Sequence, residues 1–161
     1  MAHFDPDTDL ELTRELGVSP QLIWQCWSAP DLLKQWFTPP PVKITECALD
    51  LRPGGAFVTV MEMPDGSEVT STGCVLHVVP ERRVVFTDTV LQDFRPAPGP
   101  FMTVHISLVP SDAGTLYHAH VMHADSAARD AHRDMGFETG WAIALDQLEE
   151  LAAARDTAPL F

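Results

Sequence analysis

The segment that decides the fold is the C-terminal stretch 126–154, which reads SAARDAHRDMGFETGWAIALDQLEELAAA. Its apolar residues recur at helical spacing around Trp141, whereas the acidic residues of the second half lie away from that face. The apolar set consists of Phe137, Ala144, Leu145, Leu148, Leu151 and Ala152. The pattern predicts one long helix, which would run about 43 Å and could cross a whole sheet.

Two glycines, Gly136 and Gly140, lie inside this predicted helix. Each costs up to ~1 kcal/mol relative to alanine, so we interpret them as positions where the sheet or a ligand approaches the helix closely. Toward the start of the helix, the face of Trp141 carries Asp130 and Asp134. Two interpretations remain open: this end is the polar mouth of a cavity, or the helix begins beyond the sheet.

Upstream of this helix, the sequence is typical of an antiparallel sheet preceded by two short helices. Residues 8–16 alternate as a strand, with Leu10, Leu12, Arg14 and Leu16 on one side. Ser19-Pro20 begins a helix through Trp27, and Pro30 begins a second over 31–37. Further strands are expected over 42–51, 57–63, 69–79, 83–91, 101–109 and 115–122. Stretch 92–100 is too rich in proline for a central strand and is expected to be an ordered surface loop, a candidate lid. The prediction is an α+β fold in which a curved sheet carries the C-terminal helix on one face.

The net charge of the chain argues against two classes of binding partner. The chain has 161 residues and a net charge of −13, so its field repels phosphate backbones and anionic lipid. We therefore expect neither nucleic acid nor membrane as a partner. The first residues lack the basic and apolar regions of a secretory signal. Cys26, Cys47 and Cys74 have no close spacing and are interpreted as reduced, mostly buried thiols of a cytoplasmic protein.

Several segments, in their order and spacing, resemble a known family. They are Arg14; Val18-Ser19-Pro20 with Leu22-Ile23-Trp24; Pro30-Asp31-Leu32 with Trp36; Leu49-Asp50-Leu51-Arg52-Pro53-Gly54-Gly55; Pro64-Asp65-Gly66; Gly73-Cys74-Val75; Pro80 with Arg83-Val84-Val85-Phe86; and Gly140-Trp141 with Leu145 and Leu148. Together they are similar to the homologues of the heat-shock-protein-90 ATPase activator, a family of the START-like helix-grip (SRPBCC) superfamily. The resemblance covers about 10–152, the core of a single expected domain over 1–161.

The resemblance implies a curved antiparallel sheet that grips the C-terminal helix, with a cavity between them that often takes apolar small molecules. It leaves three functions open. The first is binding of an apolar or aromatic small molecule, without a cofactor. The second is a co-chaperone-like role in the stress response, with a chaperone as the partner. The third is a cyclase or hydrolase that uses a cavity carboxylate such as Asp88 or Asp134. A homodimer is compatible with each.

The predicted ligand-binding residues are mostly aromatic. A cavity wall shared by Trp36, Phe57, Phe86, Tyr117 and Trp141 is the expected site, and core packing is the alternative for each of them. Arg14 falls among leucines on the apolar side of the first strand, where a guanidinium needs a partner. It is either an anchor for an acidic or carbonyl group of a ligand or half of a structural ion pair.

Histidines offer the one candidate metal site. His118 and His120 share a face of the last strand, and His105 lies on the strand expected beside it. Strand alternation, however, turns all three to the outer side of the sheet, where we expect solvated or interface histidines and no metal. The sequence has no nucleophile elbow, phosphate-binding loop or dinucleotide fingerprint, and we assign no catalytic residue.

Overall fold

A computed structural model describes residues 2–156, and its centre is a seven-stranded antiparallel sheet. The strands are β1 (Asp9–Leu16), β2 (Lys43–Leu49), β3 (Ala56–Glu62), β4 (Glu68–Val79), β5 (Arg83–Thr87), β8 (Thr103–Pro110) and β9 (Thr115–Met122). They pair in the order β1-β9-β8-β5-β4-β3-β2. Because β1 pairs with β9, the first strand of the chain closes one edge of the sheet beside the last strand.

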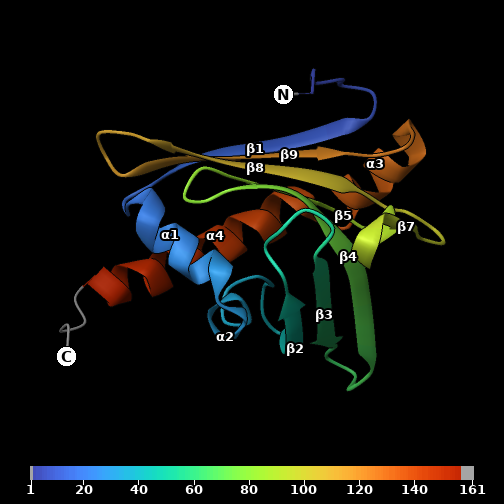
Figure 1. Cartoon of the computed structure of the whole chain (residues 1–161), viewed down its shortest axis with the longest axis horizontal. Coiled ribbons are helices and arrows are strands. Elements are labelled where there is room, and N and C mark those ends of the chain that lie inside the picture. Colours follow the sequence, from blue (N-terminus) through green and yellow to red (C-terminus); the bar gives the residue numbers. More distant parts are fainter. Residues whose placement is uncertain (1, 157–161) are drawn as a thin grey trace.

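The helices lie on the concave side of this sheet. The two short helices are α1 (Pro20–Ser28) and α2 (Pro30–Leu33), and the C-terminal pair is α3 (Ser126–Asp134) and α4 (Phe137–Asp156). Figure 1 shows the sheet bending, so that β2, β3 and β4 run across the direction of β1, β8 and β9, with α4 inside the bend. These features confirm the predicted α+β class and helix-grip arrangement. No helix within residues 2–156 is long and apolar enough to cross a membrane.

The alternation of β8 and β9 sets the two faces of the sheet. Val104, Ile106 and Leu108 on β8 are buried, and so are their neighbours Tyr117, Ala119 and Val121 on β9. Residues of the opposite parity, such as Val109 and Leu116, are exposed at the far end of the same strands. Since successive side chains of a strand point to opposite faces, the predicted inward set is confirmed.

The prediction of one continuous C-terminal helix is wrong, because the chain breaks at Gly136. That glycine has a φ of +93°, a left-handed conformation that ends α3, and its amide donates to the Arg133 carbonyl at 3.0 Å. The amide of Gly140 then donates to the Gly136 carbonyl, and α4 continues from there. The apolar face of α4 and the polar face of α3 therefore belong to separate helices, so Asp130 and Asp134 do not share a face with Trp141.

Two shorter segments also differ from expectation. The strand expected over 83–91 ends at Thr87, and the loop expected over 92–100 takes part in a short hairpin. In this hairpin β6 (Val90–Leu91) pairs with β7 (Arg95–Pro96) around the single-turn helix η1 (Gln92–Phe94). Proline is tolerated there because this two-stranded hairpin has only edges. The second short helix ends at Leu33 instead of continuing to residue 37.

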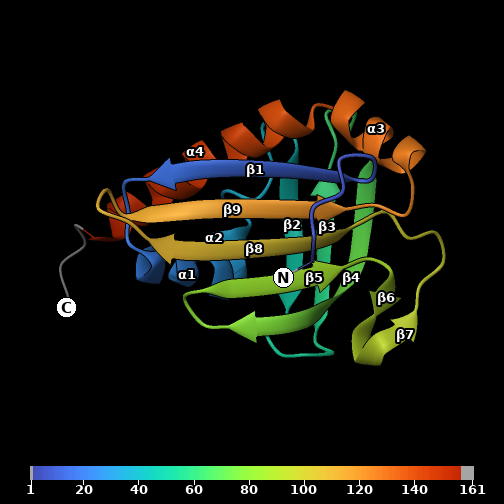
Figure 2. The same ribbon diagram turned by 90° about the horizontal axis from the view of Figure 1, so that it is seen from above.

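The N-terminal segment before β1 crosses the outer face of the sheet, over β9 and β8 (Figure 2). The outward orientation of the histidines is confirmed, but the expected solvation of His120 is wrong: it is 3% exposed, packs against the ring of Phe4 and lies 2.7 Å from Asp9. Burial raises the pKa of Asp9, whereas hydrogen bonds from the Asp5 amide, His120 and Thr8 more than offset it, so the net pKa is lowered.

Candidate functional site

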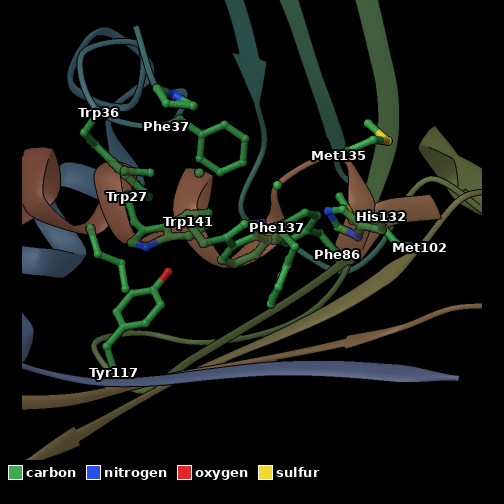
Figure 3. A pocket seen from close by; sticks show the side chains of 15 residues that line it. Trp27, Trp36, Phe37, Phe86, Met102, Tyr117, His132, Met135, Phe137 and Trp141 are labelled. Carbon is green, nitrogen blue, oxygen red and sulfur yellow. The ribbon is translucent and has the colours of Figure 1, made fainter. Parts of the chain in front are cut away.

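The candidate site is a cavity of about 230 Å³ between α4 and the sheet. Figure 3 shows side chains converging on it from α1, the segment after α2, two inner strands and the α3–α4 junction. The residues that line it are Trp27, Trp36, Phe37, Pro39, Phe86, Met102, Tyr117, His132, Met135, Gly136, Phe137, Gly140, Trp141, Ala144 and Leu145. None of these side chains is an acid, a lysine or an arginine, so the wall is apolar apart from a few hydrogen-bonding groups.

One side of the cavity is a network of aromatic rings. Trp27 meets Trp36 edge-to-face with ring centroids 5.1 Å apart, and both contact Phe37 in the same geometry. Trp27 also lies 6.1 Å from Phe86. Edge-to-face pairs of this kind add stability beyond the area that they bury. The network therefore forms a firm wall at the end of the cavity that α1 provides.

Hydrogen bonds from the backbone and from α4 hold this wall in place. The indole N–H of Trp36 donates to the Cys26 carbonyl at 3.1 Å. The side-chain amide of Gln147, on α4, donates to the carbonyls of Trp36 and Thr38 at 3.1 and 3.0 Å. The segment after α2, which has no regular structure of its own, is thereby tied to the helix on which Trp141 lies.

Four of the six predicted ligand-binding residues line this cavity: Trp36, Phe86, Tyr117 and Trp141. Phe57 lies one ring further along, 4.9 Å from Phe86, and lines a smaller adjoining cavity of about 60 Å³. Sequence reasoning did not assign Trp27 or Phe137 to the cavity, although Phe137 had been placed on the apolar face of the C-terminal helix. It also missed His132, whose position depends on the break at Gly136.

Arg14 lies outside the cavity, at the edge where β1 meets α4. Its guanidinium donates to the Ala142 carbonyl at 3.0 Å and forms an ion pair with Asp146. The side chain of Asp146 is 62% exposed, so the pair lies near the surface and contributes little more than an ordinary surface salt bridge. Of the two interpretations of Arg14, the geometry is that of the structural ion pair.

The two carboxylates considered for catalysis are also outside this cavity. Asp88 accepts hydrogen bonds from the amides of Phe101 and Met102 at 2.8 and 2.9 Å and lines the smaller cavity. Asp134 is exposed on α3 and pairs with Arg133.

The cysteines do not supply a nucleophile either. Burial raises the pKa of the Cys26 and Cys47 thiols, which keeps them protonated and poorly nucleophilic.

One end of the cavity carries hydrogen-bond donors. Trp27 is 2% exposed, and its indole N–H has no hydrogen-bond partner of normal geometry within residues 2–156. The hydroxyl of Tyr117 lies beside it, as Figure 3 shows. Burial raises the pKa of Tyr117, and the indole N–H of Trp27 offsets only part of the rise, so the hydroxyl keeps its proton. Two hydrogen-bond donors, the indole N–H of Trp27 and the hydroxyl of Tyr117, therefore meet at this end.

The opposite end carries a histidine whose proton position is set by a chain of hydrogen bonds. A carbonyl can only accept, so His123 Nδ1 donates to the Thr8 carbonyl at 2.9 Å. In the neutral pair, His123 Nε2 must then accept, and its partner at 2.9 Å is His132 Nδ1. His132 therefore carries its proton on Nδ1 and leaves Nε2 bare. Burial, and then the positive charge that His123 carries when it is protonated, lower the pKa of His132 to about 4, so His132 is neutral at pH 7.

This histidine makes stability depend on pH. Because the pKa falls from 6.5 in the unfolded chain to about 4 in the fold, the unfolded state binds more protons between these values. The contribution of neutral His132 to the free energy of unfolding is fully present above pH 6.5. It is lost as the pH falls toward 4, by roughly 3 kcal/mol in total.

Urea unfolding at pH 7 and pH 4 is expected to show this loss in the wild type and a loss smaller by about that amount in His132→Leu. His3→Leu, at an exposed site, should behave as the wild type; equal losses in all three proteins would contradict the assignment.

A curved antiparallel sheet around a C-terminal helix, with an apolar cavity between them, defines a helix-grip protein. The chain matches the model of the Activator of Hsp90 ATPase homolog 1-like protein family over residues 17–153 and belongs to that family. The resemblance drawn from the sequence is thereby confirmed. No protein with a curated description matches the chain.

Solved structures agree with this assignment. The chain is similar to protein NE0264 from Nitrosomonas europaea, with 42% identity, a TM-score of 0.93, and coverage of 96% of this chain and 100% of that one. A Rhodobacter sphaeroides protein is 26% identical at a TM-score of 0.79, covering 93% and 96% of the two chains. An AHSA1-like protein from Aeromonas hydrophila, 20% identical at a TM-score of 0.70 over 95% and 97% of the chains, shares the fold.

Proposed function

We propose that this protein binds a neutral apolar or aromatic small molecule in the cavity between α4 and the sheet. The observation that carries the proposal is the cavity itself: about 230 Å³ lined mainly by aromatic and aliphatic side chains, with no ionised group in its wall. An engineered cavity of about 150 Å³ already takes up benzene, so this volume suits a substituted ring. A charged ligand would lose its hydration without gaining a counter-ion there.

Gly140 supports the same proposal. A glycine inside α4 costs about 1 kcal/mol relative to alanine, yet a β-carbon at this position would meet only Pro39 Cγ, at 3.8 Å. Packing against the sheet therefore does not require a glycine at this position. The missing side chain instead leaves open space in the wall of the cavity, and a ligand would use that space.

Thermal unfolding in the presence of ethylbenzene tests the proposal, because this probe has the size and polarity of the cavity and no hydrogen-bonding group. We expect a saturable rise in melting temperature that corresponds to ~2.7 kcal/mol at one hundred times the dissociation constant. Phenylacetate and benzylammonium, charged molecules of similar shape, should stabilise the protein far less. A melting temperature that does not respond to ethylbenzene would overturn the proposal.

A chaperone partner receives less support from the surface. Within residues 2–156, the large exposed apolar side chains lie on six different elements or turns: Val69, Phe94, Val109, Leu116, Met135 and Ile143. Only Val109 and Leu116 are paired, across β8 and β9. A docking surface needs a contiguous apolar patch of several hundred Å², and these scattered side chains favour ligand binding as the function instead.

A further inference from the structure

The two ends of the cavity differ in hydrogen-bonding character, and this difference selects among ligands. At one end, the indole N–H of Trp27 and the hydroxyl of Tyr117 are both donors. Even if the indole donates to the Tyr117 oxygen, the hydroxyl hydrogen still lacks an acceptor among the bonds formed within residues 2–156. A ligand group that can accept is therefore favoured at this end, because it would satisfy the buried indole N–H of Trp27.

At the other end, His132 offers an acceptor. Its Nδ1–H is used in the bond to His123, 2.9 Å away, so Nε2 is the ring nitrogen that His132 can present to the cavity it lines. Figure 3 places this imidazole beside Phe137 and Met135, remote from Trp27 and Tyr117. The ring is clamped by Phe101 and Phe137, whose centroids lie 4.9 and 5.1 Å from it. A flip of the ring about its Cβ–Cγ bond would carry Nδ1 away from His123 and break this hydrogen bond.

We propose that the cavity selects neutral ring compounds that carry a hydroxyl or N–H group, and that His132 Nε2 accepts the hydrogen bond from that group. The proposal rests on the proposed function and adds the polarity and the orientation of the ligand. The donor of the ligand lies at the α3–α4 junction, and its apolar or acceptor end points toward Trp27 and Tyr117. His123 is a positioning residue, since it holds the proton of His132 on Nδ1 without lining the cavity.

Three probes of one shape separate this proposal from simple apolar binding: ethylbenzene, para-ethylphenol and para-ethylanisole. The wild type should bind para-ethylphenol roughly three- to ten-fold more tightly than ethylbenzene, as one added hydrogen bond allows. Para-ethylanisole has the oxygen but no donor, so it can only accept from Trp27 or Tyr117, and its affinity should not depend on His132. In His132→Phe the advantage should vanish while ethylbenzene still binds. His118→Phe, on the outer face of the sheet, is the control and should retain it.

The role of His123 is read from the tautomer of His132 by ¹⁵N NMR. In the wild type at pH 7, the spectrum should show a protonated Nδ1 and a bare Nε2, and His123→Phe should mix the two tautomers and reduce the preference for para-ethylphenol. If ethylbenzene and para-ethylphenol bind equally, or if the preference survives in His132→Phe, the inference is overturned while the proposed function stands. If no probe binds, both fail.

Discussion

Gly140→Leu is expected to abolish most ligand binding while making the protein more stable. The new side chain enters the open space beside Pro39 and occupies the volume that a bound ring would fill. Excluding the ligand from the area that a leucine buries removes roughly 2–3 kcal/mol of its binding free energy, or about 30- to 150-fold in affinity. Leucine is also a better helix former than glycine, by roughly 0.5–1 kcal/mol. Calorimetric titration with ethylbenzene and urea unfolding measure the two effects.

Thr139→Leu is the matched control for this variant. It places the same side chain on the neighbouring position of α4, which is exposed and outside the cavity wall. Affinity for ethylbenzene should stay within two- to three-fold of the wild type. Retained affinity in Gly140→Leu would mean that ligands bind elsewhere, and a large loss of stability would mean that the space beside Gly140 is already filled.

Trp27→Ala is expected to destabilise the fold by about 3–5 kcal/mol, the range for truncation of a large buried aromatic. Its ring is 2% exposed and contacts Trp36, Phe37 and Phe86. Removing it takes an edge-to-face partner from Trp36 and Phe37 and a tilted one from Phe86, and joins the new void to the cavity. Urea unfolding at pH 7, with the slope checked for two-state behaviour, measures the change.

Trp141→Ala provides the comparison, because Trp141 lines the same cavity but is only half-buried. Its ring contacts that of Phe137, with centroids 5.2 Å apart. Since part of its indole already faces open space, the loss should stay below about 3 kcal/mol. A penalty for Trp141→Ala as large as that for Trp27→Ala would describe a filled core in place of a cavity.

The sheet was predictable because strand patterns are local. The expected strand 115–122 coincides with β9, and the alternation of β8 and β9 assigned each inward residue correctly. A period of two is visible in any short stretch and depends on burial of one face. The turn at residues 80–82 has strands on both sides as expected, and these strands pair as β4 and β5.

The break in the C-terminal helix was not predictable by the same reasoning. No proline interrupts residues 132–141, and a glycine costs too little in a helix to mark its end. Gly136 and Gly140 look alike in the sequence, yet only Gly136 adopts a positive φ. Tertiary packing decides which glycine breaks the helix, and with it the position of His132.

The residues of the candidate site were also predictable only in part. Trp36, Phe86, Tyr117 and Trp141 could be selected as large aromatics on inward faces, and all four line the cavity. The hydrogen-bonded pair His123–His132 could not, because its members come from the segment after β9 and from α3, and the sequence does not show how α3 packs against that segment. His120 was likewise assigned to the correct face, but the N-terminal segment that buries it has no strand or helix pattern to reveal its path.

Methyl NMR of the methionines during titration with ethylbenzene tests most directly whether the cavity binds ligands. Met102 and Met135 line the cavity, whereas Met63 lies in the turn between β3 and β4 and outside its wall. We expect the methyl signals of Met102 and Met135 to shift to saturation with a single dissociation constant, while that of Met63 stays in place. The same titration of Gly140→Leu should leave all three unmoved. Unshifted Met102 and Met135 signals in the wild type, or equal drift of all three methyls without saturation, would contradict a ligand-binding cavity.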